Sequence, residues 1–260
     1  MAMSNKFKSK FLNIPLLISI VSLFVSICST FYYTRMSNQL SAQARLTELV
    51  DKIYVLDIEK NSLKKEKDAD FNKISNVQLQ MKHLLFEIDK MTSSQNLSQP
   101  QNRLLADTFA DFLYYEYAQK YWDRVFDEDF TVPELEAEYY RRYAEFLYSK
   151  RDFEGGEVAF RKSLSLANNT DNRRYINHQT LTNWAGLEYR RESYNFYLNK
   201  ARGKAVLLPR FEKAYALLQE SKQINDFIEE YVLYYNAVND YNRIMNEIHH
   251  FMTENRVHIK

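Results

Sequence analysis

The chain has 260 residues and is almost neutral, with 35 Lys and Arg against 34 Asp and Glu. Nucleic-acid binders need a basic face or tail, so this balance argues against a nucleic-acid partner. The single cysteine, Cys28, lies in an apolar run and leaves the rest of the chain without a disulfide framework, a Cys-based metal site or a thiol nucleophile. Only four Gly and four Pro interrupt the chain, far fewer than the turns of a sheet protein require. The composition therefore predicts an all-α protein.

Residues 11–33 (FLNIPLLISIVSLFVSICSTFYY) contain no charged side chain. About 20 apolar residues cross the hydrocarbon core of a bilayer as a helix, so this run predicts a single transmembrane helix. A buried core helix, a cleaved signal peptide and a lipoprotein signal at Cys28 are the alternatives. The two signals fit less well, because Thr30 and the aromatic residues after it give no small-residue cleavage site and because Ile27 is bulky.

The charges that flank this run set its expected orientation. Lys6, Lys8 and Lys10 precede it, whereas Arg35 and Arg45 follow it closely. The positive-inside tendency then makes residues 1–10 a cytoplasmic basic tail and places the remaining chain outside an inner or plasma membrane. Further lysines between residues 60 and 67 oppose this orientation.

Residues 34–91 are expected to form a coiled-coil stalk. From residue 46, positions at alternating steps of three and four are mostly apolar, as in the seam of a coiled coil. Such a stalk would join copies of the chain into a homo-oligomer and, if continuous, extend about 70 Å. The alternative is a pair of core helices in one bundle, with a break at residues 61–70. The seam positions are Leu46, Leu49, Ile53, Leu56, Lys60, Leu63, Lys67, Asp70, Ile74, Val77, Met81, Leu84, Ile88 and Met91.

Residues 92–101 (TSSQNLSQPQ) are polar, lack periodicity and include Pro100, which predicts a linker. The domain that follows is expected to cover residues 102–260.

The clearest motif of that domain spans residues 137–169 (AEYYRRYAEFLYSKRDFEGGEVAFRKSLSLANN). Large and small side chains alternate on two predicted helices, because close crossing needs small residues and large ones fill the adjacent grooves. The pattern resembles a tetratricopeptide repeat, although Tyr140 replaces the usual tryptophan and Asn168 the closing proline. The pattern positions are Tyr140, Tyr143, Ala144, Leu147, Phe153, Gly156, Phe160 and Ser163.

One such repeat cannot bury its faces alone, so further helical hairpins are expected on both sides of it. The upstream hairpin would carry Phe109, Phe112, Tyr117, Trp122 and Val125. The downstream hairpin would carry Trp184, Leu187, Phe211, Ala214, Leu218 and Ser221, with a basic and aromatic insertion at residues 194–210.

A final helix at residues 223–253 completes the expected domain. Its apolar residues step by three and four, and solenoids need a cap for solubility, so we expect it to cap the last repeat. An oligomerising or partner-binding helix is the alternative. The stepped residues are Ile224, Phe227, Tyr231, Tyr234, Val238, Tyr241, Met245, Ile248 and Met252.

No phosphate-binding loop, metalloprotease motif or serine elbow occurs in the sequence, so no enzyme and no cofactor are expected. One weak pattern, Arg173 followed after four residues by His178, resembles the R-x4-6-H signature of HEPN ribonucleases. That resemblance implies a catalytic pair. The alternative function is a cytoplasm-facing, membrane-tethered effector, either such a ribonuclease or an assembly-triggered toxin.

The resemblance to tetratricopeptide repeats implies a groove that binds a peptide or helix of another protein. The expected function is therefore a membrane-anchored scaffold, adaptor or chaperone-like module. By that analogy the first helices of the repeats line the groove. The residues expected to contact a partner are Tyr139, Arg142, Glu145 and Arg190.

Overall fold

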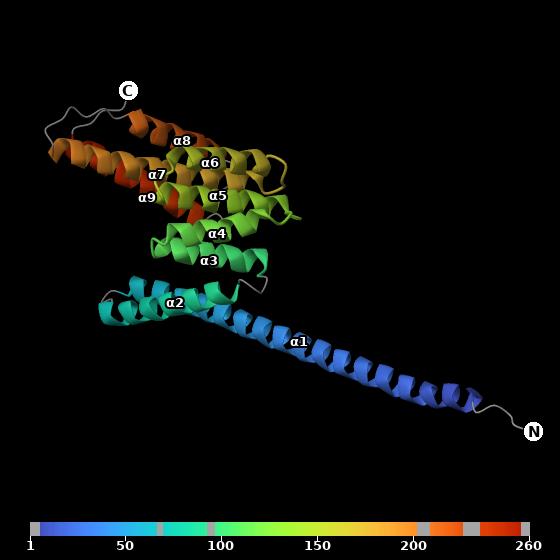
Figure 1. Ribbon diagram of the computed structural model, residues 1–260. Coiled ribbons are helices and arrows are strands. Elements are labelled where there is room, and N and C mark those ends of the chain that lie inside the picture. Colours follow the sequence, from blue (N-terminus) through green and yellow to red (C-terminus); the bar gives the residue numbers. More distant parts are fainter. Residues whose placement is uncertain (1–5, 67–69, 93–96, 202–208, 226–234, 256–260) are drawn as a thin grey trace, which may run out of the picture. The chain divides into compact units, whose positions relative to one another are not determined.

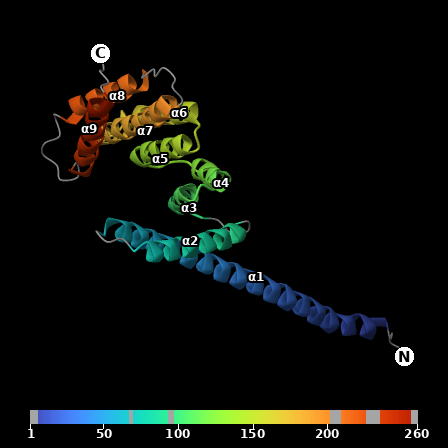
Figure 2. The same cartoon turned by 90° about the vertical axis from the view of Figure 1, so that its left-hand side faces the viewer.

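A computed structural model describes residues 6–66, 70–92, 97–201, 209–225 and 235–255. Throughout these ranges the regular structure is α-helical and includes no strand, which confirms the predicted all-α class (Figures 1 and 2). The chain forms two compact units, Met1–Leu105 and Ala106–Lys260.

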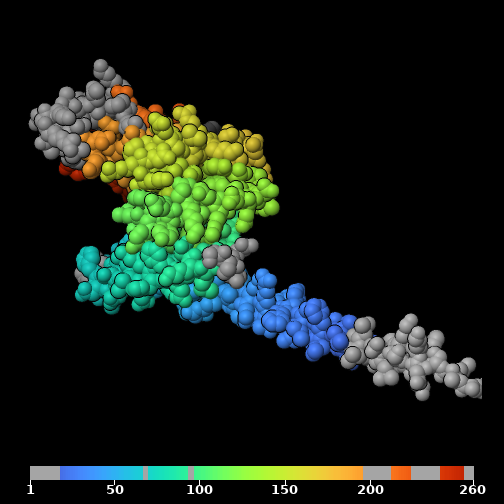
Figure 3. Space-filling model, in the orientation of Figure 1, coloured from blue at the N-terminus to red at the C-terminus, as the bar shows by residue number. Residues whose placement is uncertain are grey.

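The N-terminal unit begins with one uninterrupted helix, α1 (Lys6–Lys65), which passes through the predicted span 11–33 and far beyond it. Every side chain from Ile18 to Ser41 is exposed, and the corresponding blue segment of Figure 3 is bare on its visible side. A core helix would bury this segment within the chain, so that alternative does not fit. By length and composition, α1 is able to cross a membrane.

Helix α2 (Phe71–Met91) folds back antiparallel to α1 and packs against it (Figure 1). The carboxylate of Asp70 caps α2 by accepting hydrogen bonds from the backbone N–H groups of Asn72 (3.0 Å) and Lys73 (3.2 Å). The turn thus lies at the edge of the break considered for residues 61–70, and the two helices do not continue as one 70 Å stalk. Within one chain, the seam thus pairs α1 with α2, and the predicted pairing between chains stays a prediction.

The buried residues of this unit follow most of the predicted seam. Leu56, Leu63, Leu84 and Met91 are only half-buried. Lys60 is 3% exposed and forms an ion pair with Asp57 (2.6 Å). The other buried side chains of α1 and α2 are Leu46, Leu49, Val50, Ile53, Ile74, Val77, Met81, Leu85 and Ile88.

Helix α3 (Gln99–Asp111) spans the boundary between the two units, and the helices after it lie in the C-terminal unit (Figures 1 and 2). Since α3 starts at residue 99, the last residues of the predicted linker 92–101 are helical, and residues 93–96 lie outside the described ranges. The helices are α3 (Gln99–Asp111), α4 (Tyr115–Phe126), α5 (Pro133–Ser149), α6 (Phe153–Ala167), α7 (Arg173–Ala201), α8 (Pro209–Asn225) and α9 (Tyr235–Asn255).

Helices α5 and α6 form the hairpin expected at residues 137–169. Small side chains lie where the helices approach: a Cβ atom added to Gly156 would come within 2.4 Å of the Tyr148 ring. Ala144 and Phe160 are fully buried in the same hairpin. Helices α5 and α6 therefore approach closely at Gly156.

The turns of α3–α4 and α5–α6 have the same geometry. In the first, Leu113 has φ 64° and the N–H of Tyr114 donates to the carbonyl of Phe109 (2.9 Å). In the second, Arg151 has φ 70° and the N–H of Asp152 donates to the carbonyl of Leu147 (2.8 Å). Both are Schellman closures in which a non-glycine residue occupies the left-handed position.

The interiors of these two hairpins correspond in the same register. Positions equivalent to the small and large residues of α5 and α6 are buried and similar in size in α3 and α4. Three buried positions of α3 and α4 therefore match three buried positions of α5 and α6 in spacing and approximate size. The corresponding buried pairs are Ala106 and Ala144, Ala118 and Gly156, and Trp122 and Phe160.

Helices α7 and α8 pack together as the expected third pair. Trp184, Ala214, Leu218 and Ser221 are buried, and Leu187 is half-buried. Much of the predicted insertion at 194–210 lies outside the described residues.

The predicted final helix, 223–253, corresponds to the end of α8 and to α9, and residues 226–234 lie outside the described ranges. Helix α9 packs on both α7 and α8. Tyr241 and Ile248 are buried as predicted, but Ile244 and Phe251 replace Met245 and Met252 as the other buried residues. The contact face of α9 is therefore rotated slightly from the predicted one.

Candidate functional site

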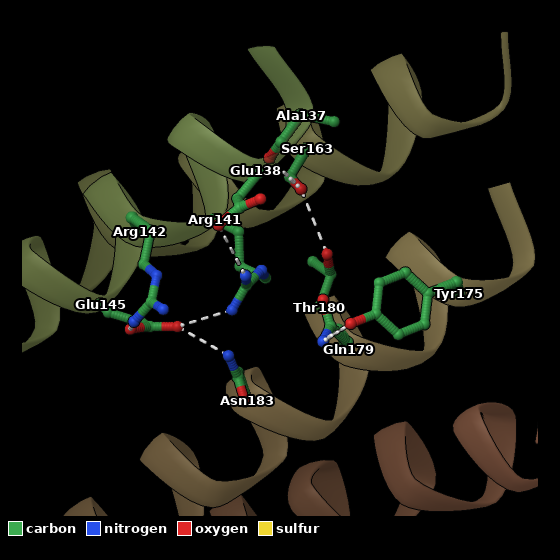
Figure 4. Close-up of polar contacts among 10 residues, drawn as sticks. All are labelled: Ala137, Glu138, Arg141, Arg142, Glu145, Ser163, Tyr175, Gln179, Thr180 and Asn183. Atoms are coloured by element: carbon green, nitrogen blue, oxygen red, sulfur yellow. Dashed lines mark hydrogen bonds and ion pairs between the residues drawn. The ribbon is translucent and has the colours of Figure 1, made fainter. Parts of the chain in front are cut away.

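A group of mostly charged side chains lies between α5 and α7 (Figure 4). Spacings of three and four residues place the four α5 members on one face of that helix. We call this group the Arg142 cluster. It consists of Glu138, Arg141, Arg142 and Glu145 on α5 and Asn183 on α7.

The Glu145 carboxylate is the centre of the Arg142 cluster. It receives donors from Arg141 Nη1 (3.3 Å), Arg142 Nη1 (3.3 Å) and Asn183 Nδ2 (2.6 Å). Three donors from two helices fix the orientation of this carboxylate, and its charge holds the two guanidinium groups in place.

The two arginines differ in burial. The side chain of Arg141 is 7% exposed, and burial lowers its pKa against the opposing effect of Glu145. The side chain of Arg142 is 42% exposed, and its pKa is raised because Glu145, Asp107 and Glu138 outweigh the effect of burial. The buried Arg141 therefore helps to hold the Glu145 carboxylate in place, whereas the Arg142 guanidinium is exposed enough to bind a carboxylate or carbonyl group of another molecule.

The structure brings together two of the four residues expected to contact a partner, Arg142 and Glu145. Tyr139 is only 3% exposed and its ring packs edge-on against Phe130 at 5.6 Å, so it cannot line a groove as expected. Arg190 is exposed on α7, two turns along from Asn183 and on nearly the same face. Asn183 was not predicted, although its spacing from Arg190 could have indicated it.

A second polar group is buried among α5, α6, α7 and α8. Glu188 has no exposed surface and accepts hydrogen bonds from Tyr148 Oη (2.7 Å) and Lys213 Nζ (2.8 Å). Lys213 also pairs with Glu157 (2.7 Å), and Trp184 Nε1 lies 3.3 Å from the Glu188 carboxylate. Burial, followed by the hydrogen bond to Glu188, raises the pKa of Tyr148 well above its ordinary range.

The sequence analysis missed this buried group. Charged helix residues are usually solvated. However, Glu188 follows Trp184 by four residues, so helical spacing alone places it on the buried face of α7. The closed surroundings indicate that the group fixes how the hairpins pack.

The residues of the alternative catalytic pair occupy different environments. Arg173 is exposed at the first position of α7. His178 is fully buried, with Nδ1 2.7 Å from Ser221 Oγ, which in turn lies 2.9 Å from Thr182 Oγ1. The structure does not bring the Arg173 and His178 side chains into one exposed site.

Among the described residues, no group of three or more His, Cys, Asp or Glu side chains is arranged to hold a metal ion. No family model, curated protein or solved structure gives a significant match to the chain. The chain is an all-α protein with an N-terminal helix that is long and apolar enough to cross a membrane.

Proposed function

We propose that this protein is a membrane-anchored scaffold or adaptor that binds another protein through its C-terminal unit. The observation that carries the proposal is the apolar segment of α1, in which every described side chain up to Ser41 is exposed. Exposed apolar surface of this extent is costly in water, whereas it is stabilised in the hydrocarbon core of a bilayer. The first charged residue after Lys10 is Arg35.

The proposed orientation has residues 1–10 in the cytoplasm and the C-terminal unit on the outer side of an inner or plasma membrane. It rests on the three lysines that precede the span.

The proposed partner surface is the Arg142 cluster together with Arg190, on a domain of tetratricopeptide-like hairpins. The repeated turn and interior of α3–α4 and α5–α6 support this assignment, because stacked helical repeats commonly bind peptides or helices. Arg142 would contact an acidic side chain or a carbonyl of the partner. Glu145 Oε2, which accepts from Arg142, has a further lone pair that would accept a donor of the partner.

The anchor is tested on the full chain in cells. Membranes are washed with alkaline carbonate, and reporters fused after Lys260 show on which side the C-terminus lies. We expect the chain to resist extraction and an outside-active reporter to be active. Release by carbonate would overturn the anchor, and an inside result would reverse the orientation.

The partner surface is tested with a photo-crosslinking amino acid placed at Arg142 or, as a control, at Arg173. Both positions have charged side chains with exposed surface on the same unit. We expect a discrete adduct with a second protein from position 142, lost when Glu145→Arg is added, and none from position 173. Absence of an adduct at 142, or equal adducts at both positions, would contradict the proposed surface.

A further inference from the structure

The α1–α2 hairpin carries an open groove of about 600 Å³. Its apolar residues are Val55 and Leu56 from α1 and Leu84 from α2, and Val55 is 60% exposed. An apolar groove with exposed walls is the kind of surface into which another helix packs. The remaining lining residues are Glu48, Asp51, Lys52, Gln80 and His83.

The same side of α1 carries a stripe of small residues outside the groove. At 3.6 residues per turn, seven small residues fall within about 100° of arc. Toward its edges this arc also contains Leu23, Tyr33 and Leu40, and below the stripe it contains Glu48, Asp51 and Val55. All seven are exposed. We call them the small-residue stripe: Ser19, Ser22, Ser26, Thr30, Ser37, Ser41 and Ala44.

Helix α1 is continuous from the start of the stripe to the end of the groove wall. Stripe and groove therefore form one straight surface, about 50 Å long between Ser22 and Val55. A partner that uses this whole surface must itself be a long helix that runs parallel to α1 and crosses the membrane beside it.

We propose that the occupant is a second copy of this chain, with the two α1 helices side by side and parallel. The proposal rests on the membrane anchor proposed above, because anchoring in one bilayer with one orientation aligns each α1 with its counterpart. Small side chains let two helix backbones approach closely within the membrane, where packing rather than hydrophobic burial drives association. Val55 and Leu56 of each copy then meet beyond the membrane and cover the apolar groove.

The charges along the groove suit a two-fold contact of this kind. Acidic Glu48 and Asp51 lie beside basic Lys52, and Glu48 pairs with Lys52 within the chain at 2.7 Å. The side chains of this pair are about half exposed, so they are free to exchange partners across an interface. In a parallel two-fold pair centred near Val55, Lys52 and Asp51 flank the contact on opposite sides, so Lys52 of each copy lies beside Asp51 of the other.

The first experiment is disulfide cross-linking of the full chain in its membrane. In a Cys28→Ser background, Ser37→Cys lies on the stripe, whereas Gln39→Cys is equally exposed but about 200° away around α1. We expect oxidation to link Ser37→Cys into a dimer at least fivefold more than Gln39→Cys. Equal linking at both positions, no linking at Ser37→Cys, or linking to a different protein would overturn the proposal.

A second pair of variants tests the groove itself. Val55→Arg places a charge in the groove, and Tyr54→Arg places one on a different face of α1 at nearly the same exposure (60% and 58%). We expect Val55→Arg to reduce the Ser37→Cys dimer severalfold and Tyr54→Arg to leave it unchanged, with the helix content of both unaltered by circular dichroism. An undiminished dimer in Val55→Arg would contradict the role of the groove.

The membrane wash separates the two proposals. A chain that resists carbonate but links equally at positions 37 and 39 retains its anchor and loses only the dimer. If carbonate releases the chain, the result contradicts both the membrane anchor and the dimer.

Discussion

The two units of the molecule differ in what fills their interiors. The buried residues of α1 and α2 are aliphatic or Met, except Lys60, whose ion-pair partner Asp57 is 32% exposed. Between α5 and α8 the interior holds fully buried polar side chains such as Glu188, His178 and Ser221, joined by hydrogen bonds across helices. Apolar contacts tolerate sliding, whereas hydrogen bonds require one relative position. The C-terminal unit therefore has its helix register fixed by polar contacts, and the N-terminal hairpin has it fixed mainly by apolar periodicity.

The largest effect is expected from removing the buried carboxylate. Glu188→Ala leaves the hydroxyl of Tyr148 buried without its acceptor and removes one carboxylate partner of Lys213, while the indole N–H of Trp184 keeps its hydrogen bond to Tyr148 Oη (2.9 Å). We expect a loss of about 3–5 kcal/mol in the free energy of unfolding, measured by urea titration in detergent. Glu220→Ala, at an exposed position of α8, is the control and should change it by less than about 0.5 kcal/mol. Similar values for the two variants would refute the role of the buried network.

The next effect comes from the close approach in the α5–α6 hairpin. A Cβ atom at Gly156 would meet the Tyr148 ring at 2.4 Å, and that ring is held by Glu188. We expect Gly156→Ala to cost about 1–3 kcal/mol in the same titration, because the ring must shift. Gly155→Ala is the neighbouring control.

At Gly155 an added Cβ meets only the Asp152 side chain at 2.7 Å. That carboxylate is able to move, at the cost of part of the hydrogen bond it accepts from Gly155 N–H. Better helix propensity offsets this cost, so a change within about 1 kcal/mol is expected. A larger loss at Gly155 than at Gly156 would contradict the packing of this hairpin.

In the N-terminal unit, one substitution is expected to increase the stability of the protein. Lys60→Met replaces a buried charge in an apolar seam and frees Asp57, which is exposed enough to be hydrated. We expect the free energy of unfolding to rise by about 1 kcal/mol, because a charged seam residue weakens helix packing. The thermal midpoint of the full chain in detergent, compared with Lys64→Met at an exposed position, checks it. Destabilisation by Lys60→Met would show that this unit, too, depends on a buried polar contact.

The smallest effects test the repeated turns. Leu113 and Arg151 hold left-handed backbone conformations that side chains disfavour. Leu113→Gly and Arg151→Gly should each raise the free energy of unfolding by about 0.5–1 kcal/mol, because glycine adopts this conformation without strain. Lys150→Gly, one residue before the left-handed position, should be destabilising in the same assay. Opposite signs for Leu113→Gly and Arg151→Gly would break the equivalence of the two hairpins.

Several features were predictable from the sequence because they depend on local periodicity. The uncharged run at 11–33, the seam from Leu46 to Ile88 and the small residues Ala144 and Gly156 each have a spacing that one helix imposes on its own. The exposed apolar part of α1 and the α5–α6 hairpin follow from them. Of the candidate site, Arg142 and Glu145 were selected because the resemblance to tetratricopeptide repeats implies that first-helix residues line a groove.

The rest depended on contacts between distant segments, which no local pattern encodes. Periodicity marked the seam but could not say whether it pairs within one chain or between two, and the turn capped by Asp70 decided that α2 folds back. Tyr139 was expected on a surface, yet the ring of Phe130 covers it. The spacing of Glu188 from Trp184 places it on the buried face of α7, but only Tyr148 and Lys213, which come from other helices, make its burial stable. The sequence by itself determined the helices and their apolar faces, and tertiary packing decided which polar side chains are buried, because a buried charge is stable only beside partners that folding brings to it.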